Sequence, residues 1–173
     1  PGDGLRVQGT ADSLAQGVEL RNITVTWDIG PDAENGAYGL YPVQAENVLV
    51  EGCKVSAASD AGIYVGQSRN IIVRDSEAFE NVAGIEIENS TLADVYENEA
   101  YNNTGGLLVF NLPELDIKEG GTNRIHNNQI YDNNEMNFAP TGVVMLVPAG
   151  SGVILLGGST GNEIFNNSIT GNQ

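Results

Sequence analysis

The chain lacks several features that define common classes of small protein. Among its 173 residues Cys53 is the only cysteine, so no disulfide can form within the chain, and the usual covalent stabilisation of a small secreted domain is absent. Lysine and arginine number 7 against 23 aspartate and glutamate residues, which gives a net charge of −16. Such a surface repels a phosphate backbone, so we predict no nucleic-acid partner.

Long hydrophobic segments are also missing. The longest apolar run covers 143–147, whereas a membrane helix needs about 20 apolar residues, so we predict no membrane insertion. A strand pattern starts within a few residues of Pro1. We therefore expect a single domain over 1–173 that is a fragment of a longer protein.

A short motif recurs along the chain at a nearly constant interval. Glycine is followed by an aliphatic residue, one variable residue and often a second aliphatic residue. The motif occupies 4–7, 39–40, 62–65, 84–87, 106–109 and 152–155. The four central copies follow one another at steps of 22 or 23 residues, so we interpret them as one strand position in successive coils of a solenoid.

A second motif combines an aliphatic strand end, a turn rich in Asn, Asp or Gly, and a small or aliphatic residue that resumes the strand. It occupies 20–25, 50–55, 73–78, 95–100, 125–130 and 164–169. These turn residues tolerate left-handed backbone conformations, so the chain can bend sharply there. Asn98, Asn128 and Asn167 take the same place in three copies, and we expect them to form an amide ladder inside the turn.

Together the motifs predict an all-β fold, a single-stranded right-handed parallel β-helix of about six coils. Each coil of 22–23 residues holds three short strands, and each strand pairs in parallel with its equivalent in the next coil, about 4.8 Å away. The predicted core columns are Leu40, Ile63, Ile85, Leu107 and Val153 on the first sheet, and Val55, Ala78, Ala100, Ile130 and Ile169 on the third.

These repeats resemble the pectin-lyase-like family of right-handed parallel β-helices, and more closely the bacterial proteins built from short β-helix repeats. The resemblance covers nearly the whole chain. It implies an extracellular, periplasmic or cell-surface module and a polysaccharide partner. It implies no single activity, because this architecture serves lyases, hydrolases, epimerases, tailspikes and adhesins.

One segment is similar to a catalytic motif of that fold. Residues 38–43 read Tyr-Gly-Leu-Tyr-Pro-Val, whereas mannuronan C5-epimerases carry Tyr-Gly-x-Asp-Pro-His on the equivalent strand. Tyr41 stands where that family has its catalytic Asp, and Val43 where it has its His. The two residues that do acid–base work are absent, so we do not expect that mechanism here.

Three segments interrupt the repeat, and loops on a solenoid are its usual functional variable. They cover 27–38, 111–122 and 133–151. The first and third both lie between the third strand of one coil and the first strand of the next, so we expect them to wall a cleft. All three are expected to frame the outer face of the first sheet.

Strand alternation places aromatic and acidic residues together on that outer face. Tyr rings stack on the C–H faces of sugars, and carboxylates accept sugar hydroxyl protons. The predicted carbohydrate-binding residues are Tyr41, Tyr64 and Glu86, with Trp27 and Tyr38 from the ends of the first loop. We expect the module to bind or associate with polysaccharide there. The alternative interpretation is an ordinary solvated ladder on a twisted sheet.

The same face offers weak catalytic candidates. Glu86 and Glu88 are alternate strand residues about 7 Å apart, within the 5–9.5 Å that glycosidase carboxyl pairs need, and Asp60 lies nearby. We favour a binding module over an enzyme. The alternative is a carbohydrate-active enzyme, either a glycoside hydrolase or a polysaccharide lyase or epimerase. His126, the only histidine, is interpreted as a surface residue beside a turn of the second sheet.

We predict no cofactor and no firm metal site. Asp28, Asp32 and Glu34 in the first loop are weak Ca²⁺ candidates, and a solvated acidic loop is the preferred interpretation. A third functional class is a structural surface protein. The ends of a solenoid expose stacked apolar coils unless they are capped, so end-to-end self-association or trimer formation is an alternative.

Overall fold

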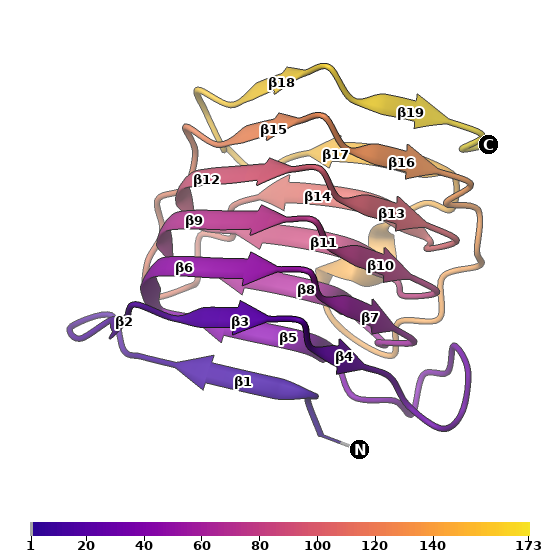
Figure 1. Ribbon diagram of the computed structural model, residues 1–173, viewed down its shortest axis with the longest axis horizontal. Helices are drawn as coiled ribbons and strands as arrows, with labels where there is room; N and C mark the ends of the chain where they lie inside the picture. Colours follow the sequence, from indigo (N-terminus) through magenta and orange to yellow (C-terminus); the bar gives the residue numbers. More distant parts are fainter. Residues whose placement is uncertain (1) are drawn as a thin grey trace.

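The computed structural model describes residues 2–173 and shows a right-handed solenoid of stacked parallel strands (Figure 1). The first sheet contains β1 (Leu5–Gln8), β5 (Tyr38–Val43), β8 (Ala61–Gly66), β11 (Ala83–Glu88), β14 (Gly105–Phe110) and β17 (Ser151–Leu155). The second contains β2 (Ala15–Gln16), β3 (Glu19–Arg21), β6 (Ala45–Glu51), β9 (Arg69–Arg74), β12 (Thr91–Tyr96), β15 (Arg124–His126) and β18 (Glu163–Phe165). The third contains β4 (Thr24–Val25), β7 (Lys54–Ser56), β10 (Glu77–Phe79), β13 (Glu99–Tyr101), β16 (Gln129–Tyr131) and β19 (Ser168–Thr170).

This arrangement confirms the predicted fold and its register. On the first sheet Ile85 pairs with Ile63 on one side and Leu107 on the other, and on the third sheet Ala100 pairs with Ala78 and Ile130. The two columns belong to one continuous aliphatic core. The column ends at Ile169 in the last coil, where the side chain is 47% exposed because no further coil of the structure covers it.

Asparagine and serine ladders hold the three corners of the coil together. The predicted ladder is confirmed: the side-chain amide of Asn98 donates to Asn128 Oδ1 at 3.0 Å, and Asn128 donates to Asn167 Oδ1 at 2.9 Å. A second ladder, which we did not predict, follows five residues later at the next corner. It contains Asn81, Asn103, Asn133 and Asn172. The third corner uses Ser68, Ser90, Asn123 and Asn162, whose side-chain oxygens accept backbone N–H groups of the preceding coil.

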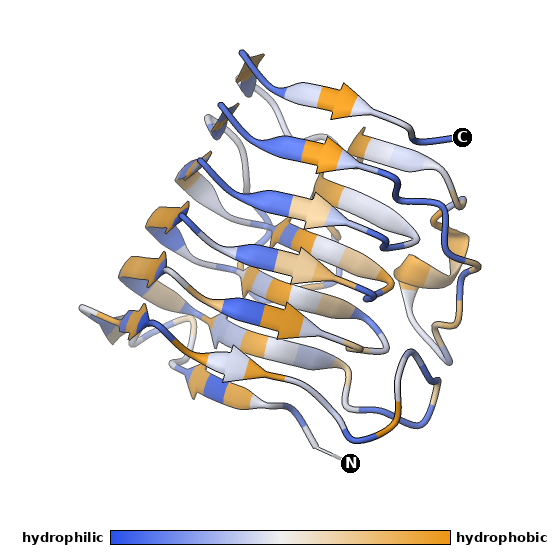
Figure 2. Cartoon of the chain, turned by 45° about the vertical axis from the view of Figure 1, so that its right-hand side comes forward, coloured by the Kyte–Doolittle hydropathy of each residue, from blue (hydrophilic) through white to orange (hydrophobic). Residues whose placement is uncertain are grey.

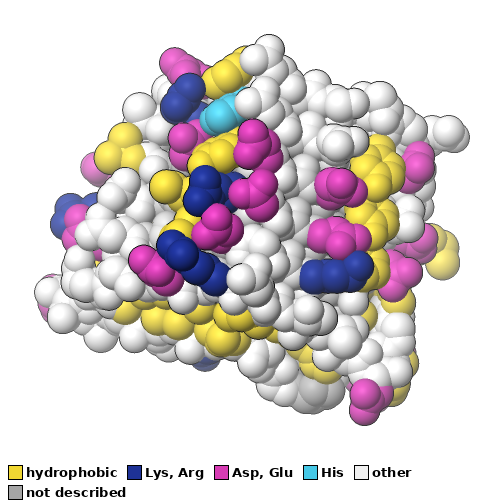
Figure 3. Space-filling view, in the orientation of Figure 1, with side chains coloured by type: hydrophobic (Ala, Val, Ile, Leu, Met, Phe, Trp, Pro, Cys, Tyr) yellow, Lys and Arg dark blue, Asp and Glu magenta, His cyan; other side chains and the backbone are white. Residues whose placement is uncertain are grey.

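Charged and aromatic side chains form outward ladders on the second and third sheets (Figure 3). Glu51 forms ion pairs with Arg74 at 2.8 Å and with Arg21 at 3.3 Å. On the third sheet Tyr101 stacks between Phe79 and Tyr131 with ring centroids 5.2 and 5.1 Å away. Because Tyr101 lies between the other two rings, both of its faces are occupied.

The loops differ from the expected arrangement. The third loop lies on the outer face of the first sheet instead of only framing it, and a cleft between this loop and the first stays a prediction. This loop includes the one short helix of the described residues, the 3₁₀ turn η1 (Val143–Leu146). Val144 and Val147 pack there with Tyr64 and Leu108 of the sheet. The side-chain amide of Asn137 donates to the carbonyl oxygens of Val144 and Val147 at 2.8 and 2.9 Å, which closes the loop on itself.

The other two loops lie along corners of the solenoid. In the first, the Asn35 side chain donates to the carbonyl oxygens of Gly30 and Ala57, each at 2.9 Å. The second folds back toward earlier coils, where the Ile117 N–H donates to Gln67 Oε1 at 3.1 Å. Within residues 2–173, no helix is long and apolar enough to cross a membrane.

Candidate functional site

Three tyrosines cluster on the outer face of the first sheet. Tyr38 and Tyr41 extend from β5, and Tyr64 from β8. The ring of Tyr38 lies 4.3 Å from Tyr41 and 4.6 Å from Tyr64, measured between centroids, and Tyr41 meets Tyr64 edge-on at 4.9 Å. The Arg6 guanidinium lies 4.8 Å from the centroid of the Tyr41 ring, an attractive cation–π distance. The cluster forms because β5 and β8 pair in the register that aligns these positions.

Gly66 leaves the space that the Tyr64 ring occupies. Gly66 is two residues further along β8, on the same face. A Cβ at Gly66 would lie 2.1 Å from Tyr64 Oη and 2.3 Å from its ring, so any side chain there would displace the tyrosine. Tyr64 is only 3% exposed, whereas Tyr38 and Tyr41 are partly accessible.

Three carboxyl groups adjoin the tyrosines. Glu86 pairs with Tyr64 in the sheet register, Glu88 pairs with Gly66, and Asp60 immediately precedes β8. Glu86 is 1% exposed and Glu88 is also buried, while Asp60 stays partly accessible. The third loop passes close to this group, since a Cβ at Gly142 would lie 3.7 Å from Asp60 Oδ2.

Burial dominates the electrostatics of these carboxyl groups. It raises the pKa of Glu86 well above its ordinary value, and the charges of Asp60 and Glu88 raise it further. Burial likewise raises the pKa of Glu88, although hydrogen bonds from Glu86 and Tyr64 oppose the increase. For Asp60, burial raises the pKa to about 7 despite hydrogen bonding to Tyr38. At neutral pH Asp60 is therefore close to its midpoint, and the environment of Glu86 favours its protonated form.

Some polar atoms of the site have no partner within the described residues. Glu86 Oε2 and Asp60 Oδ1 are both buried without a hydrogen bond. The tyrosines remain hydrogen-bond donors at neutral pH, because burial raises the pKa of Tyr38 and Tyr64 above the ordinary value. The arrangement can therefore donate and accept hydrogen bonds at sugar hydroxyls.

The predicted site residues come together only in part. Tyr38, Tyr41, Tyr64 and the carboxyl groups share one face, but the expected open platform is not present. Tyr64 and Glu86 are covered by the third loop, because its Val144 and Val147 bury their apolar surface against the sheet. Tyr38, Tyr41 and Asp60 keep partial solvent exposure.

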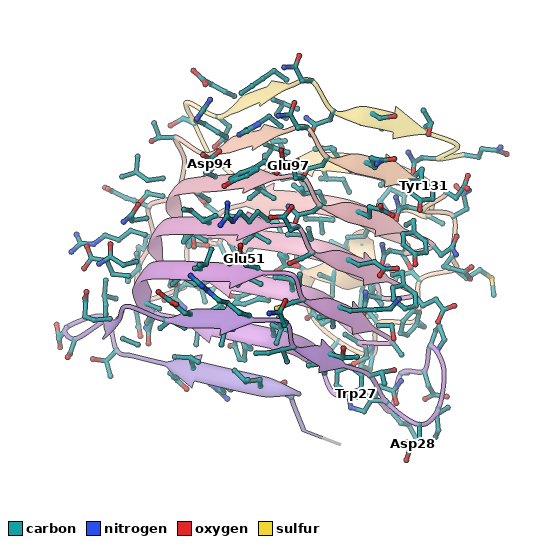
Figure 4. The ribbon with its side chains drawn as sticks, viewed as in Figure 1. Trp27, Asp28, Glu51, Asp94, Glu97 and Tyr131 are labelled. Carbon is teal, nitrogen blue, oxygen red and sulfur yellow. The ribbon has the colours of Figure 1, made fainter. Side chains whose placement is uncertain are left out.

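Trp27 does not join this cluster. It lies in the first loop beside the N-terminal coil (Figure 4), and a Cβ at Gly36 would be 2.8 Å from its ring. Its predicted role in carbohydrate binding stays a prediction. His126 is on the second sheet, where Nε2 lies 2.8 Å from Asp94 Oδ1 and the ring stacks between Tyr96 and Phe165.

The weak calcium candidates do not converge. Asp32 Oδ1 accepts the Glu34 N–H at 2.8 Å, so this carboxylate caps a turn of its own loop. Asp28 lies near the tip of that loop (Figure 4). Over the described part of the chain, no group of three or more His, Cys, Asp or Glu side chains is arranged to hold a metal ion.

Sequence reasoning missed two contributors to the site. Arg6 was not singled out, although it precedes Tyr41 in the same outward column of the sheet. The cover formed by Val144 and Val147 was also missed. Its signal is a run of aliphatic residues inside a loop, which is typical of a segment that packs onto another surface.

Three parallel sheets, stacked aliphatic columns and polar corner ladders define a parallel β-helix. A family model described as "Right handed beta helix region" matches residues 2–173, and the chain belongs to that family. No curated protein and no solved structure matches the chain.

Proposed function

We propose that this β-helix binds polysaccharide outside the cytoplasm, on the accessible part of the first-sheet face. The observation that carries the proposal is the contact between Tyr38 and Tyr41, which lie beside the partly accessible Asp60. Aromatic rings bind the apolar faces of sugars, and a carboxyl group orients their hydroxyls. The family is commonly associated with carbohydrate, which agrees with this assignment.

The charge around the site favours a neutral or cationic glycan. Asp3, Asp60, Glu88 and Glu114 all contribute negative potential there. The nearby cation Arg6 is already 4.0 Å from Asp3, so it is partly neutralised. Like-charge juxtaposition disfavours uronate polymers, so we expect binding to neutral or amino-sugar polysaccharides.

The test is affinity electrophoresis in gels that contain β-glucan, mannan, chitosan or alginate. We expect retardation by a neutral or amino-sugar polymer and none by alginate. Tyr41→Ala should weaken binding roughly tenfold, about 1.4 kcal/mol. Tyr131→Ala is the matched control, because Tyr131 belongs to the third-sheet ladder (Figure 4). Absence of retardation by every polymer, or equal losses in both variants, would contradict the proposal.

A second candidate function is glycoside hydrolysis, favoured by Glu86, whose pKa burial raises well above its ordinary value, beside Glu88. A glycosidase needs one carboxyl group to protonate the leaving oxygen and a second as base or nucleophile. Because the third loop covers Glu86, it would have to move before a sugar entered. Release of reducing ends that is lost in Glu86→Gln supports this function; an inactive wild-type protein on the same polymers excludes it for those substrates. Absorbance of unsaturated uronate distinguishes a lyase.

A further inference from the structure

A pocket of about 440 Å³ lies on the outer face of the first sheet, beyond the tyrosine and carboxyl cluster. From its walls we infer that it binds a neutral ligand with an aliphatic chain. The pocket lies on the coils that follow the proposed polysaccharide site, and different residues line it. This pocket is therefore separate from the proposed polysaccharide site, and the two can be tested independently.

The pocket exists because the outward-facing side chains change from acidic on β11 to apolar on β14. Glu86 of β11 pairs with Leu108 of β14, which in turn pairs with Ile154 of β17. In the neighbouring column Glu88 pairs with Phe110. The acidic floor of one coil is thus replaced by an apolar floor in the next.

Separate segments close the walls over this floor. The 3₁₀ turn η1 and the residues after it contribute Val144 and Val147, while Leu112 and Leu156 come from the segments that follow β14 and β17. Asn111 and Ser151 are the only lining residues with a polar side chain. A pocket of this volume is within the range of about 300–1,000 Å³ typical of small-molecule sites.

The charge pattern identifies the ligand chemistry. All 23 acidic and 7 basic residues, and the single histidine, lie outside residues 136–162, so this long segment carries no ionisable side chain. None of the residues that line the pocket is ionisable. A charged ligand group would lose hydration there without gaining a partner, whereas a neutral chain would gain burial.

The rim of the pocket is apolar and exposed to solvent. Leu146 is 80% exposed and Leu156 is 59% exposed, and both line the pocket. Figure 2 shows the hydrophobic colouring of the η1 segment beside the sheet. Exposed aliphatic side chains around a concave apolar floor indicate that a ligand chain covers them when bound. The concavity favours a small molecule over a flat protein interface, which needs about 800 Å² from each partner.

The test uses N-phenyl-1-naphthylamine, a neutral fluorophore whose emission increases in apolar surroundings, with 1-decanol as competitor. We expect saturable binding of one probe per chain and displacement by decanol, with decanoate at least tenfold weaker as a competitor. The double variant Leu146→Gln, Leu156→Gln should weaken probe binding at least tenfold. Both positions are exposed, so the fold should be retained, which circular dichroism would verify.

The matched control is the double variant Leu92→Gln, Met136→Gln, which alters two exposed apolar residues that do not line the pocket. It should bind the probe as the wild type does. Lack of saturable binding, or equal weakening in both double variants, overturns the inference. A wild-type dimer in sedimentation velocity that becomes monomeric in the pocket variant also overturns it, because a second copy would then cover the pocket.

Discussion

Glu86 and Glu88, alternate residues of β11, point from the same face of the sheet, where burial and then the charges of Asp60 and Glu88 raise the pKa of Glu86. Burial also raises the pKa of Glu88. Two ionised carboxylates this close would repel each other in the poorly solvated environment beneath the third loop, so this environment favours the protonated form. The raised pKa values therefore link the stability of the covered first-sheet face to pH. Four testable predictions concern this face and the corner ladders of the solenoid.

The free energy of unfolding should decrease as pH rises from 5 to 8. Asp60 has a folded-state pKa of about 7 against an ordinary value of 3.8, and the pKa of Glu86 is also raised. A raised folded-state pKa means that the stabilising contribution is complete below the unfolded pKa and is lost as pH rises through the folded pKa. Urea unfolding at each pH measures this dependence.

The Glu86→Gln variant is the control for that dependence. An amide keeps the shape of the protonated acid and cannot ionise, so the difference between pH 5 and pH 8 should be smaller than in the wild type. The acids with lowered pKa, Glu46 and Glu77, titrate below this window. An identical pH dependence in the variant would show that Glu86 is not responsible.

Gly66→Ala should destabilise the protein by about 1–3 kcal/mol, the usual cost of an overpacked core position. The new Cβ would overlap the Tyr64 ring, since its ideal position is 2.1 Å from Tyr64 Oη. Thermal unfolding measures the loss. Gly30→Ala is the control, because a Cβ there meets no atom within 4 Å. If Tyr64→Ala does not relieve the defect in a double variant, the clash with Tyr64 is not its cause.

Asn103→Ala should cost about 2–4 kcal/mol, because several buried polar groups lose their partners. Asn103 Oδ1 accepts from the backbone and side-chain amides of Asn81, and its Nδ2 donates to the Ala78 carbonyl oxygen and to Asn133. Urea unfolding would show the loss. Gln129→Ala, an exposed change on the third sheet, should leave stability within about 0.5 kcal/mol. A similar effect of both variants would contradict a structural role for the ladder.

Val144→Ser should release the third loop from the sheet while the coils stay folded. Val144 is almost completely buried against the outer face, so a hydroxyl at that position would lose its hydration. We expect faster proteolytic cleavage within 133–151 under native conditions, with an unchanged circular dichroism spectrum. Met145→Ser, at the exposed neighbouring position, should be cleaved at the wild-type rate. Equal cleavage of the two variants would show that the loop is not held by this contact.

The strand positions were predictable because every coil repeats the same local pattern. Ile63, Ile85 and Leu107 occupy equivalent places in the repeat, and each pairs with its equivalent in the next coil. The ladder of Asn98 and Asn128 was predictable for the same reason. The ladder through Asn103 and Asn133 has an equally regular signal, an asparagine five residues later, and could have been found by the same alignment.

The candidate site was predictable in its members but not in its accessibility. Strand alternation correctly assigned Tyr41, Tyr64 and Glu86 to the outer face of the first sheet. It could not show that Tyr64 and Glu86 are buried, because their cover comes from Val144 and Val147, far along the chain in a segment outside the repeat. The position of Trp27 apart from the tyrosines was not predictable for a related reason: the conformation of its loop is not set by the periodicity.

The sequence by itself therefore determined the coil, its register and the sign of its surface charge, since the same short-range pattern recurs and parallel pairing of equivalent positions buries it. The tertiary structure alone decided which face each loop covers, which carboxyl groups have raised pKa values and where an apolar pocket remains open. Those properties depend on contacts between residues that share no repeat, such as the cover of the third loop over Tyr64 and Glu86, and on the exclusion of water by those contacts.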